Sequence, residues 1–372
     1  MNTGNVRQQV KRLVPPIARR DEKLAALASE VRELKKELKR ARSTAPEDLG
    51  ELSALRESLE RASLQRSLDD LRRSVVPLRA IDPDQAHPLR QLPFKLRNYR
   101  LAASHGIAVP EIHATWTTVD EIDLSGLPDE FVVKSDGGAG GHGVLPLRRE
   151  SEDRYRLVST DKVMSADDVR ERLRSVTSLS GPYFAEELLR PAASDATIPE
   201  DVKIFAFYGE IGQVLLRHVH EHGNLRRTNY RFVDSSGTDL GDGVWDRRLD
   251  PSIPLPAQLE TMVEAARHLS MAVGVPFVRV DLYETDRGVV LGELTRVPGG
   301  RPQYSPAHDA FMGELYENAR WRLERDIVEG RPPGILHGAH DAPNPYPPEH
   351  VSQLPDPGTW SVQRADCARC RA

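Results

Sequence analysis

A glycine-rich stretch beside a lysine is the first part of this 372-residue chain whose residue types could do chemistry. Lys134 ends an apolar run there. The glycines that follow it are Gly137, Gly138, Gly140, Gly141 and Gly143. Backbone N–H groups of glycine approach phosphate oxygens closely because no Cβ obstructs them, and the lysine adds a positive charge. The stretch therefore predicts a loop that covers phosphates; the alternative is a surface loop with an incidental lysine.

Three of these glycines, Gly138, Gly140 and Gly143, also fit the pattern G-x-G-x-x-G. A dinucleotide-binding loop of that type must lead into a helix whose N-terminus holds pyrophosphate. Here the glycines lead into Val144–Leu147, a run that favours a strand. The P-loop pattern G-x-x-x-x-G-K-S/T does not occur. The sequence therefore predicts a hairpin with a glycine loop, and neither a Rossmann site nor a P-loop.

Two carboxylates and a hydroxyl group form a second candidate site. Asp281 belongs to one strand-like run and Glu293 to the next, and the short turn between the runs predicts a hairpin. Thr295 lies two residues beyond Glu293 and so on the same face of its strand. Paired carboxylates with a further oxygen donor suit Mg²⁺, which prefers to share its coordination with nucleotide phosphates.

An arginine accompanies this carboxylate pair. Arg279 shares the face of Asp281 through the two-residue period of a strand. A guanidinium in that place can hold a transferring phosphoryl group or a carboxylate through two parallel hydrogen bonds. The plainer interpretation is a structural Asp–Arg pair at a sheet edge.

A strand that runs into a hinge has the features of an adenine site. Its residues are Glu186, Glu187, Leu188 and Leu189. Adenine needs apolar walls and a backbone edge that pairs with the base, and the ribose hydroxyls need a carboxylate. Lys203 lies near the start of the next strand-like run and supplies a second cation.

These residues need strands to position them. Apolar runs bounded by Gly, Pro and Asp predict strands at 131–134, 143–147, 184–188, 202–208, 213–219, 277–283 and 288–293, with a shorter one at 115–116. Helical patterns occur at 165–176, 256–273 and 306–328, and a further helix is expected to end at Gly106. Turns between neighbouring strands indicate an α+β body with mainly antiparallel sheets.

The N-terminal section carries a leucine-rich heptad pattern. Apolar residues spaced by three and four lie at Leu24, Leu27, Val31, Leu34 and Leu38. After a break near Pro46, a second run comprises Leu52, Leu55, Leu59, Leu64, Leu68 and Leu71. So narrow a seam predicts either an antiparallel helical hairpin without a catalytic role or an assembly module, which would form a homo-oligomer or dock a partner protein.

The composition limits the classes of function. Basic residues number 51 and acidic residues 56, so the formal net charge is −5, which argues against a nucleic-acid binder. The two cysteines, Cys367 and Cys370, are too few for a disulfide scaffold and fit a cytoplasmic protein. No run approaches the roughly 20 apolar residues of a membrane-spanning helix.

The order of these motifs resembles the ATP-grasp fold. The glycine-loop strand with Lys134 is followed by AEELL, DVKIFAFYG, FVRVDLY and GELT-x-x-PGG, and GIAVP precedes them. More narrowly the chain resembles the TupA-like branch, named after a teichuronopeptide biosynthesis protein, over roughly residues 90–325. With the subdomains that the resemblance implies, the chain divides into a pre-grasp segment and first ATP-grasp subdomain at 81–180 and a second subdomain at 181–328. The heptad pattern adds a helical coiled-coil-like region at 1–80, and the composition adds a Pro/Gly-rich tail at 329–372.

The resemblance also implies roles for the candidate residues. ATP would lie between the two α+β subdomains, with Lys134 and Lys203 on its phosphates and the loop 137–143 as a lid. Residues 186–189 would form the adenine hinge. Asp281 and Glu293 would carry Mg²⁺, with Thr295 at the position where the wider superfamily has Asn.

The implied reaction is the activation of a carboxylate as an acylphosphate, which an amine or another nucleophile then attacks. Arg279 and Arg296 are the candidates for neutralising the acylphosphate and holding the acceptor carboxylate. The expected substrates are small molecules or glycan precursors, in surface polysaccharide or peptide-polymer synthesis. The alternatives are a phosphotransferase with a hydroxyl acceptor and a scaffold protein that only binds nucleotide.

Two further patterns have open interpretations. His218, His220 and His222 alternate along a strand-like run and could bind Zn²⁺, line an acceptor pocket or simply be solvated. Cys367 and Cys370 form a lone C-x-x-C, which is either a zinc knuckle with upstream histidines or an incidental pair.

Overall fold

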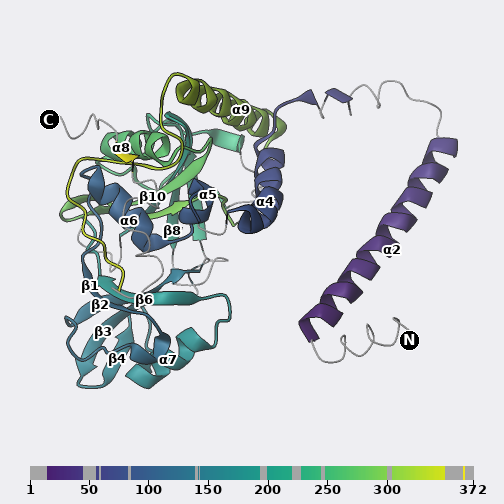
Figure 1. Ribbon diagram of the computed structural model, residues 1–372. Coiled ribbons are helices and arrows are strands. Elements are labelled where there is room, and N and C mark those ends of the chain that lie inside the picture. Colours follow the sequence, from purple (N-terminus) through teal and green to yellow (C-terminus); the bar gives the residue numbers. More distant parts are fainter. Residues whose placement is uncertain are drawn as a thin grey trace. The chain divides into compact units, whose positions relative to one another are not determined.

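The protein is described by a computed structural model that covers residues 15–44, 56–57, 60–82, 85–138, 141, 143–192, 199–219, 228–243, 248–299, 304–347 and 363–364. The chain divides into two compact units, Met1–Arg61 and Ala62–Ala372. The elements of both units are labelled in Figure 1. Among the described residues, no helix has both the length and the apolar character needed to cross a membrane.

The first unit contains the helix α2 (Pro15–Thr44), which confirms the expected N-terminal helix. Two prolines open it, a position where proline costs no helical hydrogen bond. The five apolar residues of its heptad seam are between 48% and 56% exposed. Within the described residues of the first unit, no apolar surface covers this seam. The predicted coiled-coil partner therefore stays a prediction.

The second leucine run is described only in part, because Leu52, Leu55 and Leu59 lie outside the described residues. Leu64 and Leu68 lie in α4 (Leu64–Ile81) and are buried against α9 (Pro306–Val328). The chain approaches α9 so closely that a Cβ on Gly313 would lie 2.3 Å from the backbone nitrogen of Ser63. This differs from a hairpin between the two leucine runs, because the aromatic-rich surface beneath α4 and α9 offers these leucines a larger apolar area.

Six strands of the described residues form the first sheet. They are β1 (Ile112–Trp116), β2 (Glu130–Gly137), β3 (Val144–Ser151), β4 (Arg154–Leu157), β5 (Val163–Met164) and β6 (Ser180–Glu187). Their order is β1-β6-β2-β3-β4-β5, and every pairing is antiparallel. The glycine stretch therefore joins two antiparallel strands, as the sequence predicts.

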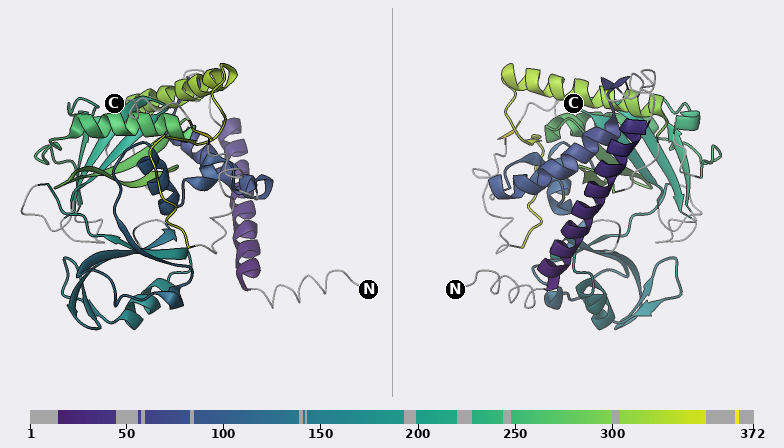
Figure 2. Two further views of the ribbon diagram at one scale, coloured as in Figure 1. Left: turned by 60° about the vertical axis from the view of Figure 1, so that its left-hand side comes forward. Right: turned by 90° about the vertical axis from the view of Figure 1, so that its right-hand side faces the viewer.

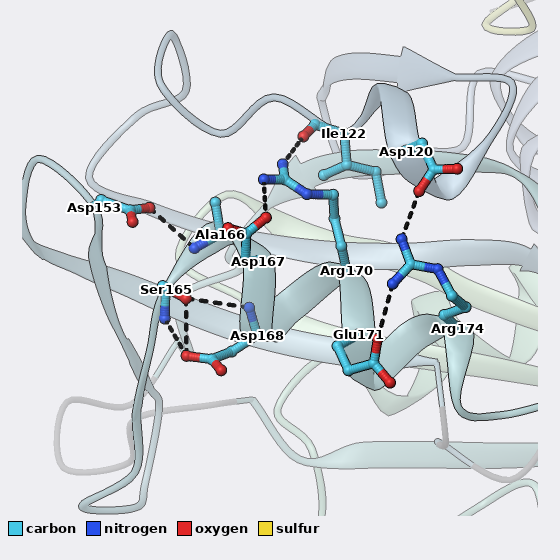
Figure 3. Close-up of polar contacts among 10 residues, drawn as sticks. All are labelled: Asp120, Ile122, Asp153, Ser165, Ala166, Asp167, Asp168, Arg170, Glu171 and Arg174. Atoms are coloured by element: carbon cyan, nitrogen blue, oxygen red, sulfur yellow. Dashed lines mark hydrogen bonds and ion pairs between the residues drawn. The ribbon is translucent and has the colours of Figure 1, made fainter.

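The helix α7 (Ala166–Arg174) is fixed to this sheet by caps and arginines. Ser165 and Asp168 form a reciprocal capping box at its start. Further along, Arg170 donates a hydrogen bond to the carbonyl of Ile122, and Arg174 pairs with Asp120 of the 3₁₀ turn η1 (Val119–Glu121) (Figure 3). The apolar side of α7 packs into a core that includes Phe131 and Tyr155.

Five strands in the described part of the chain form the second sheet. They are β7 (Asp201–Phe207), β8 (Glu210–Val219), β9 (Thr228–Val233), β10 (Val278–Thr285) and β11 (Gly288–Thr295). Their order is β11-β10-β7-β8-β9, again antiparallel throughout. The predicted α+β class with mainly antiparallel sheets is thereby confirmed.

The two faces of the second sheet have different partners. Ile204 and Ala206 of β7 join the core under α8 (Leu259–Val273), whereas Phe205 and Phe207 pack with α4 and α9. The ribbons of this sheet and of these helices can be followed in Figure 2. Alternation along a strand explains this division. Lys203 shares the face of Phe205, so that one face of β7 is aromatic where α9 covers it and charged further along.

Short connections join the two sheets. Two helices lead into β1: α5 (Pro88–Gln91) and α6 (Lys95–Ser104). Ala108 then bridges Val290 of β11, and Pro191, beyond β6, bridges Thr285 of β10. The chain therefore passes twice along the β10–β11 hairpin as it moves between the sheets.

The described residues of the C-terminal segment up to 347 pack on the body of the second unit. Ile335, Leu336 and Tyr346 belong to the main core. The amide of His340 donates to the carbonyl of Ser104 at the end of α6. The remaining elements are the 3₁₀ turn η3 (Gly241–Gly243) and a parallel pair of short strands, β12 (Leu336–His337) and β13 (Gln363–Arg364).

Replacement of a buried α4 leucine should destabilise the body. We expect Leu68→Ala to lower the free energy of unfolding by about 2–5 kcal/mol because it opens a cavity beside α9. Val76→Ala, also in α4, is the matched control, since Val76 is 69% exposed. Urea unfolding followed by tryptophan fluorescence measures both variants; equal effects of the two substitutions would contradict the packing of α4.

Candidate functional site

A charged network lies on one face of β7, β10 and β11. Asp281 is directly opposite Glu293 on β11 and Lys203 on β7. The Lys203 ammonium lies 2.5 Å from Asp281 and 2.6 Å from Asp201. Asp281 is only 3% exposed. The structure thus brings together the two predicted metal ligands and one predicted phosphate-binding lysine.

Asp201 is a member of this network that the sequence did not single out. Arg217 of β8 also contacts it, at 2.8 Å, and its second carboxylate oxygen is buried without a hydrogen bond. Burial alone would raise the pKa of Asp201, but the positive charges of Lys203 and Arg217 lower it. Asp201 therefore stays ionised and holds Lys203 in place. Asp201 lies two residues before Lys203 in the sequence, and this spacing was the signal that could have identified it.

Arg279 clamps Asp281 along the same strand. Two guanidinium nitrogens lie 2.6 Å from the two carboxylate oxygens, and one of them donates to the hydroxyl of Thr295 at 3.0 Å. Burial alone would lower the pKa of Arg279, but the Asp281 charge raises it. The pair lies on β10, which is the second strand of its sheet and no edge. Arg279 therefore fixes both Asp281 and Thr295.

Glu293 is the carboxylate of this network with the fewest bonds. Within the described part of the chain it makes no hydrogen bond and no ion pair. Burial raises the pKa of Glu293, and the nearby negative charge of Asp281 raises it further. A buried carboxylate with a neighbouring like charge is costly unless a cation lies between the two.

These residues fit a divalent cation. Asp281 and Glu293 supply two carboxylates, and Thr295 can supply a hydroxyl oxygen. No group of three His, Cys, Asp or Glu residues that could hold a metal occurs among the described residues. Mg²⁺ commonly takes one or two carboxylates from a protein and completes its coordination with phosphates and water. The donor set is therefore that of a metal shared with a ligand, and its role here stays a prediction.

A second charged cluster belongs to the first sheet. Lys134 of β2 forms a buried ion pair with Glu186 of β6. The hydroxyl of Tyr99 donates to Glu186 at 2.9 Å and receives a hydrogen bond from Lys134 at 3.3 Å. Burial and the Glu186 charge raise the pKa of Tyr99 well above its usual value. Tyr99 thus remains neutral and orients the ion pair.

Lys95, at the start of α6, connects the two clusters. Its ammonium donates to the carbonyls of Ser135 at 3.1 Å and of Asp136 and Gly138 at 3.4 Å. Burial lowers its pKa, while the charge of Glu293 acts in the opposite direction. The Lys95 side chain therefore contacts the base of the glycine loop and lies within electrostatic range of Glu293 on the other sheet.

Sequence reasoning missed Lys95 and Tyr99, although both lie in the run that it assigned to a helix. Their spacing of four residues puts them on one face of α6. That spacing was the signal, but only the fold shows that this face meets the ends of β2, β6 and β11.

The glycine loop starts from a firmly held base. Gly138 has φ of +139° and Gly141 has φ of +75°, conformations that side chains with a Cβ rarely adopt. Beyond the loop, the carbonyl of Gly143 accepts from the amide of Ser135. Gly137 continues β2, and Gly140 lies outside the described residues. The loop can thus present backbone amides while its two ends stay fixed.

Asp136 ties this base to the C-terminal tail. Its carboxylate is buried and accepts hydrogen bonds from the Leu96 amide at 2.8 Å and from the Tyr346 hydroxyl at 2.7 Å. Burial raises the pKa of Asp136, and these two hydrogen bonds partly oppose the rise. The tail thereby takes part in positioning the glycine loop.

The predicted adenine hinge is anchored by its second glutamate. Glu187 pairs with Arg287 of the β10–β11 turn at 2.6 Å and accepts from the amide of Glu111. Leu188 is half-buried and Leu189 is buried. Both hinge carboxylates, Glu186 and Glu187, therefore have protein partners, and a role of either one toward ribose stays a prediction.

Arg296 lies at the far end of the carboxylate network. It is half-buried and donates to the carbonyl of Leu89 in α5. Burial lowers its pKa, and so do the positive charges of Arg79 and Arg90.

The histidine and cysteine patterns lie largely outside the described residues. His218 is described, and its ring nitrogen hydrogen-bonds Glu200 at 2.7 Å. His220, His222, Cys367 and Cys370 are not described. Neither zinc hypothesis is tested by the structure.

The comparisons with known proteins agree with this arrangement. A family model described as TupA-like ATPgrasp matches residues 76–317. The chain belongs to the TupA-like ATP-grasp family. No curated protein sequence matches it.

Several solved structures of ATP-grasp proteins are similar to the chain. The D-alanine–D-alanine ligase of Bacillus anthracis is 16% identical, with 64% of this chain and 70% of that one covered and a TM-score of 0.40. That of Coxiella burnetii is 14% identical, covering 65% and 61%, with a TM-score of 0.37. The ATP-grasp ligase PsnB, complexed with a phosphomimetic variant of a minimal precursor, Mg and ADP, is 14% identical, covering 62% and 58%, with a TM-score of 0.34.

The raised pKa of Glu293 in this ATP-grasp protein should be measurable as a pH dependence of stability. Its carboxyl loses a proton near pH 4.5 when the chain is unfolded and at a higher pH when it is folded. The stability that protonation contributes is therefore full below about pH 4.5 and is lost as the pH rises through the folded pKa.

We expect the unfolding free energy of the wild type, minus that of Glu293→Gln, to fall as the pH rises from 4.5 to 8. Urea unfolding at a series of pH values in the absence of divalent metal measures it. Glu317→Gln on the exposed side of α9 is the matched control. A difference for Glu293→Gln that stays constant or rises with pH would refute the like-charge pair.

Proposed function

We propose that this protein is an ATP-dependent ligase that activates a carboxylate as an acylphosphate and joins it to an amine or a related nucleophile. The single observation that carries the proposal is the presence of two charged clusters, one on each sheet: Lys134 pairs with Glu186 on the first sheet, and Lys203 pairs with Asp281 on the second. Membership of the TupA-like ATP-grasp family supports it.

In this proposal the two predicted lysines bind the phosphates of ATP. Lys134 and Lys203 are each 9% exposed and belong to different sheets. Each is held by a carboxylate, Glu186 for the first and Asp201 for the second, so that both ammonium groups are positioned before a ligand arrives. The amides of the glycine loop would cover the phosphates, and Leu188 and Leu189 would contact adenine.

Asp281 and Glu293 would hold Mg²⁺, with Thr295 as a further oxygen donor. The bound ion would neutralise negative charge on the phosphate oxygens. Arg279 keeps Asp281 and Thr295 in fixed orientations, so the ligand geometry does not depend on the metal. The remaining guanidinium N–H groups of Arg279 would donate hydrogen bonds to the transferred group and so stabilise the negative charge that develops on it.

The proposed reaction needs no nucleophilic side chain. A carboxylate oxygen of the first substrate attacks the γ-phosphorus of ATP, the bond to the β-phosphate oxygen breaks, and ADP leaves. The amine of the second substrate then attacks the acyl carbon, phosphate departs with the electron pair of the broken C–O bond, and the amine loses a proton. Positioning and charge neutralisation account for the rate.

The test offers ATP, Mg²⁺ and hydroxylamine together with candidate carboxylates, and it measures ADP and hydroxamate. We expect stoichiometric ADP, phosphate and hydroxamate with the right carboxylate. Asp281→Asn and Lys203→Met should lower the rate roughly 100-fold or more, because the first removes a proposed ligand of Mg²⁺ and the second removes a cation that neutralises transition-state charge. Asp70→Asn, at an exposed pair on α4, is the matched control.

Two outcomes would replace this proposal. A stable phosphorylated product without hydroxamate would identify a phosphotransferase with a hydroxyl acceptor. Nucleotide binding without any turnover would contradict the proposed site and would indicate a scaffold protein that only binds nucleotide. Turnover that is unchanged in Asp281→Asn would also contradict the proposed site.

The expected substrates are small-molecule or glycan-precursor carboxylates and amines of surface polymer synthesis. This part of the proposal rests on the resemblance to the TupA-like branch alone.

We also propose that α2 makes the protein a homo-oligomer. Its seam has Leu24, Val31 and Leu38 at the a positions and leucines at the d positions, an apolar a/d pattern that packs against a partner helix in coiled coils. The seam residues are about half-exposed within the chain.

Removal of residues 1–61 should lower the molecular mass to that of a monomer in light scattering, and it should leave nucleotide binding intact because α4 is kept. Leu27→Asp combined with Leu34→Asp in the full chain should have the same effect, since a charge in the seam is not tolerated. Ser29→Asp, off the seam, is the control. A truncated protein that keeps the oligomeric state of the full chain would refute the role of α2.

A further inference from the structure

Three arginines from separate segments lie near one another where the carboxylate network ends. They are Arg79 in the last turn of α4, Arg90 in α5 and Arg296 directly after β11. Two hydrogen bonds fix the segments: Arg296 donates to the carbonyl of Leu89 in α5, and Arg72 of α4 donates to the carbonyl of Pro298. We call these three residues the arginine cluster.

Among the described residues, no carboxylate pairs with the arginine cluster. In the described part of the chain, none of its three guanidinium groups forms an ion pair. Its neighbours on α4 are different, because Arg72 pairs with Asp69 and Arg73 with Asp70. The cluster thus differs from the ordinary charged surface of the same helix, where acids and bases are interspersed.

The cluster also holds an unused hydrogen-bond donor. The Nε of Arg90 is buried and has no hydrogen-bond partner. A buried donor without an acceptor costs free energy, and like charges brought together cost more. Burial lowers the pKa of Arg296, and the positive charges of Arg79 and Arg90 lower it further. An anion bound between the guanidinium groups would relieve both costs.

The position of the cluster relates it to the proposed reaction. Arg296 follows Thr295, whose hydroxyl is held by Arg279 of the carboxylate network. The phosphates of ATP already have Lys134 and Lys203 as candidate partners on the strands. The cluster is therefore placed to hold a second anion, next to the end of β11 that carries the carboxylates.

We propose that Arg79, Arg90 and Arg296 form an oxyanion site that holds a carboxylate or phosphate group of the acceptor substrate. The identification of the bound anion as part of the acceptor substrate rests on the proposed ligase function. It predicts that the acceptor carries a negative charge in addition to the carboxylate that is activated. Guanidinium groups suit this task because each offers parallel N–H donors in a planar fork to two oxygens.

The test uses citrate as the carboxylate probe and inorganic phosphate as the phosphate probe, each titrated calorimetrically into the full chain without metal. We expect Arg90→Gln and Arg296→Gln to weaken binding roughly tenfold or more, because each removes a charge-assisted hydrogen bond. Arg73→Gln, an exposed arginine of α4, is the matched control and should bind as the wild type does. Arg90→Lys should bind with intermediate affinity, since it keeps the charge and loses the fork.

The arms distinguish the two sources of the anion. If the arginine variants lose affinity for citrate alone, the natural anion is a carboxylate. If they lose affinity for inorganic phosphate alone, it is a phosphate group. Probes that do not bind the wild type, or that bind all arginine variants equally, overturn the proposal. So does binding that is lost in Lys203→Met and kept in Arg90→Gln, because the anion would then occupy the strand site.

The same variants separate this inference from the proposed function. Thermal stabilisation by ADP with Mg²⁺ should persist in Arg90→Gln and Arg296→Gln, which also shows that these variants fold. If ADP with Mg²⁺ stabilises the variants and their anion binding is unchanged, the oxyanion site is refuted and the ligase proposal is not. A wild type without nucleotide stabilisation would remove the ligase proposal, while the anion titration would still decide the fate of the arginine cluster.

Discussion

The structure depends on a set of buried charges that must balance. Asp201, Asp281 and Glu293 bring three carboxylates to one face of a sheet, while Lys203, Arg217 and Arg279 bring three cations. Buried charges are tolerated only when partners compensate for lost hydration. Asp281 contacts two of these cations and, in the described part of the chain, Glu293 contacts none, so the network is complete around one carboxylate and open at the other. A cation bound beside Glu293 would complete it.

The first sheet repeats this principle with a neutral mediator. Lys134 and Glu186 form a pair of opposite charges, and the hydroxyl of Tyr99 contacts both. Lys95 then satisfies carbonyls at the base of the glycine loop while it lies within electrostatic reach of Glu293. The two sheets are therefore coupled through α6, and a ligand that altered the charge at one cluster would change the environment of the other.

The supports of these charges come from distant parts of the chain. Asp136, next to the glycines, is held by an amide of α6 and by Tyr346 of the C-terminal tail. Glu187, at the hinge, is held by Arg287 of the β10–β11 turn. Such contacts restrict the loop base and the hinge without touching the residues proposed to bind phosphate. They explain why a Pro/Gly-rich tail with little periodicity still contributes Ile335, Leu336 and Tyr346 to the core.

The sequence by itself determined the features whose causes are local. Two-residue alternation predicted the strands around Lys134, Lys203, Asp281 and Glu293, and the shared face of Arg279 and Asp281 followed from the same period. The glycine stretch could be assigned to a hairpin because a strand-like run follows it. Only the tertiary structure decided that Lys95, Tyr99, Asp136 and Tyr346 support the site, that α4 packs on α9, and that three arginines gather beyond β11. These contacts join residues far apart in the chain, and the energy of such a contact depends on burial and on neighbouring charge, which no local pattern of residues specifies.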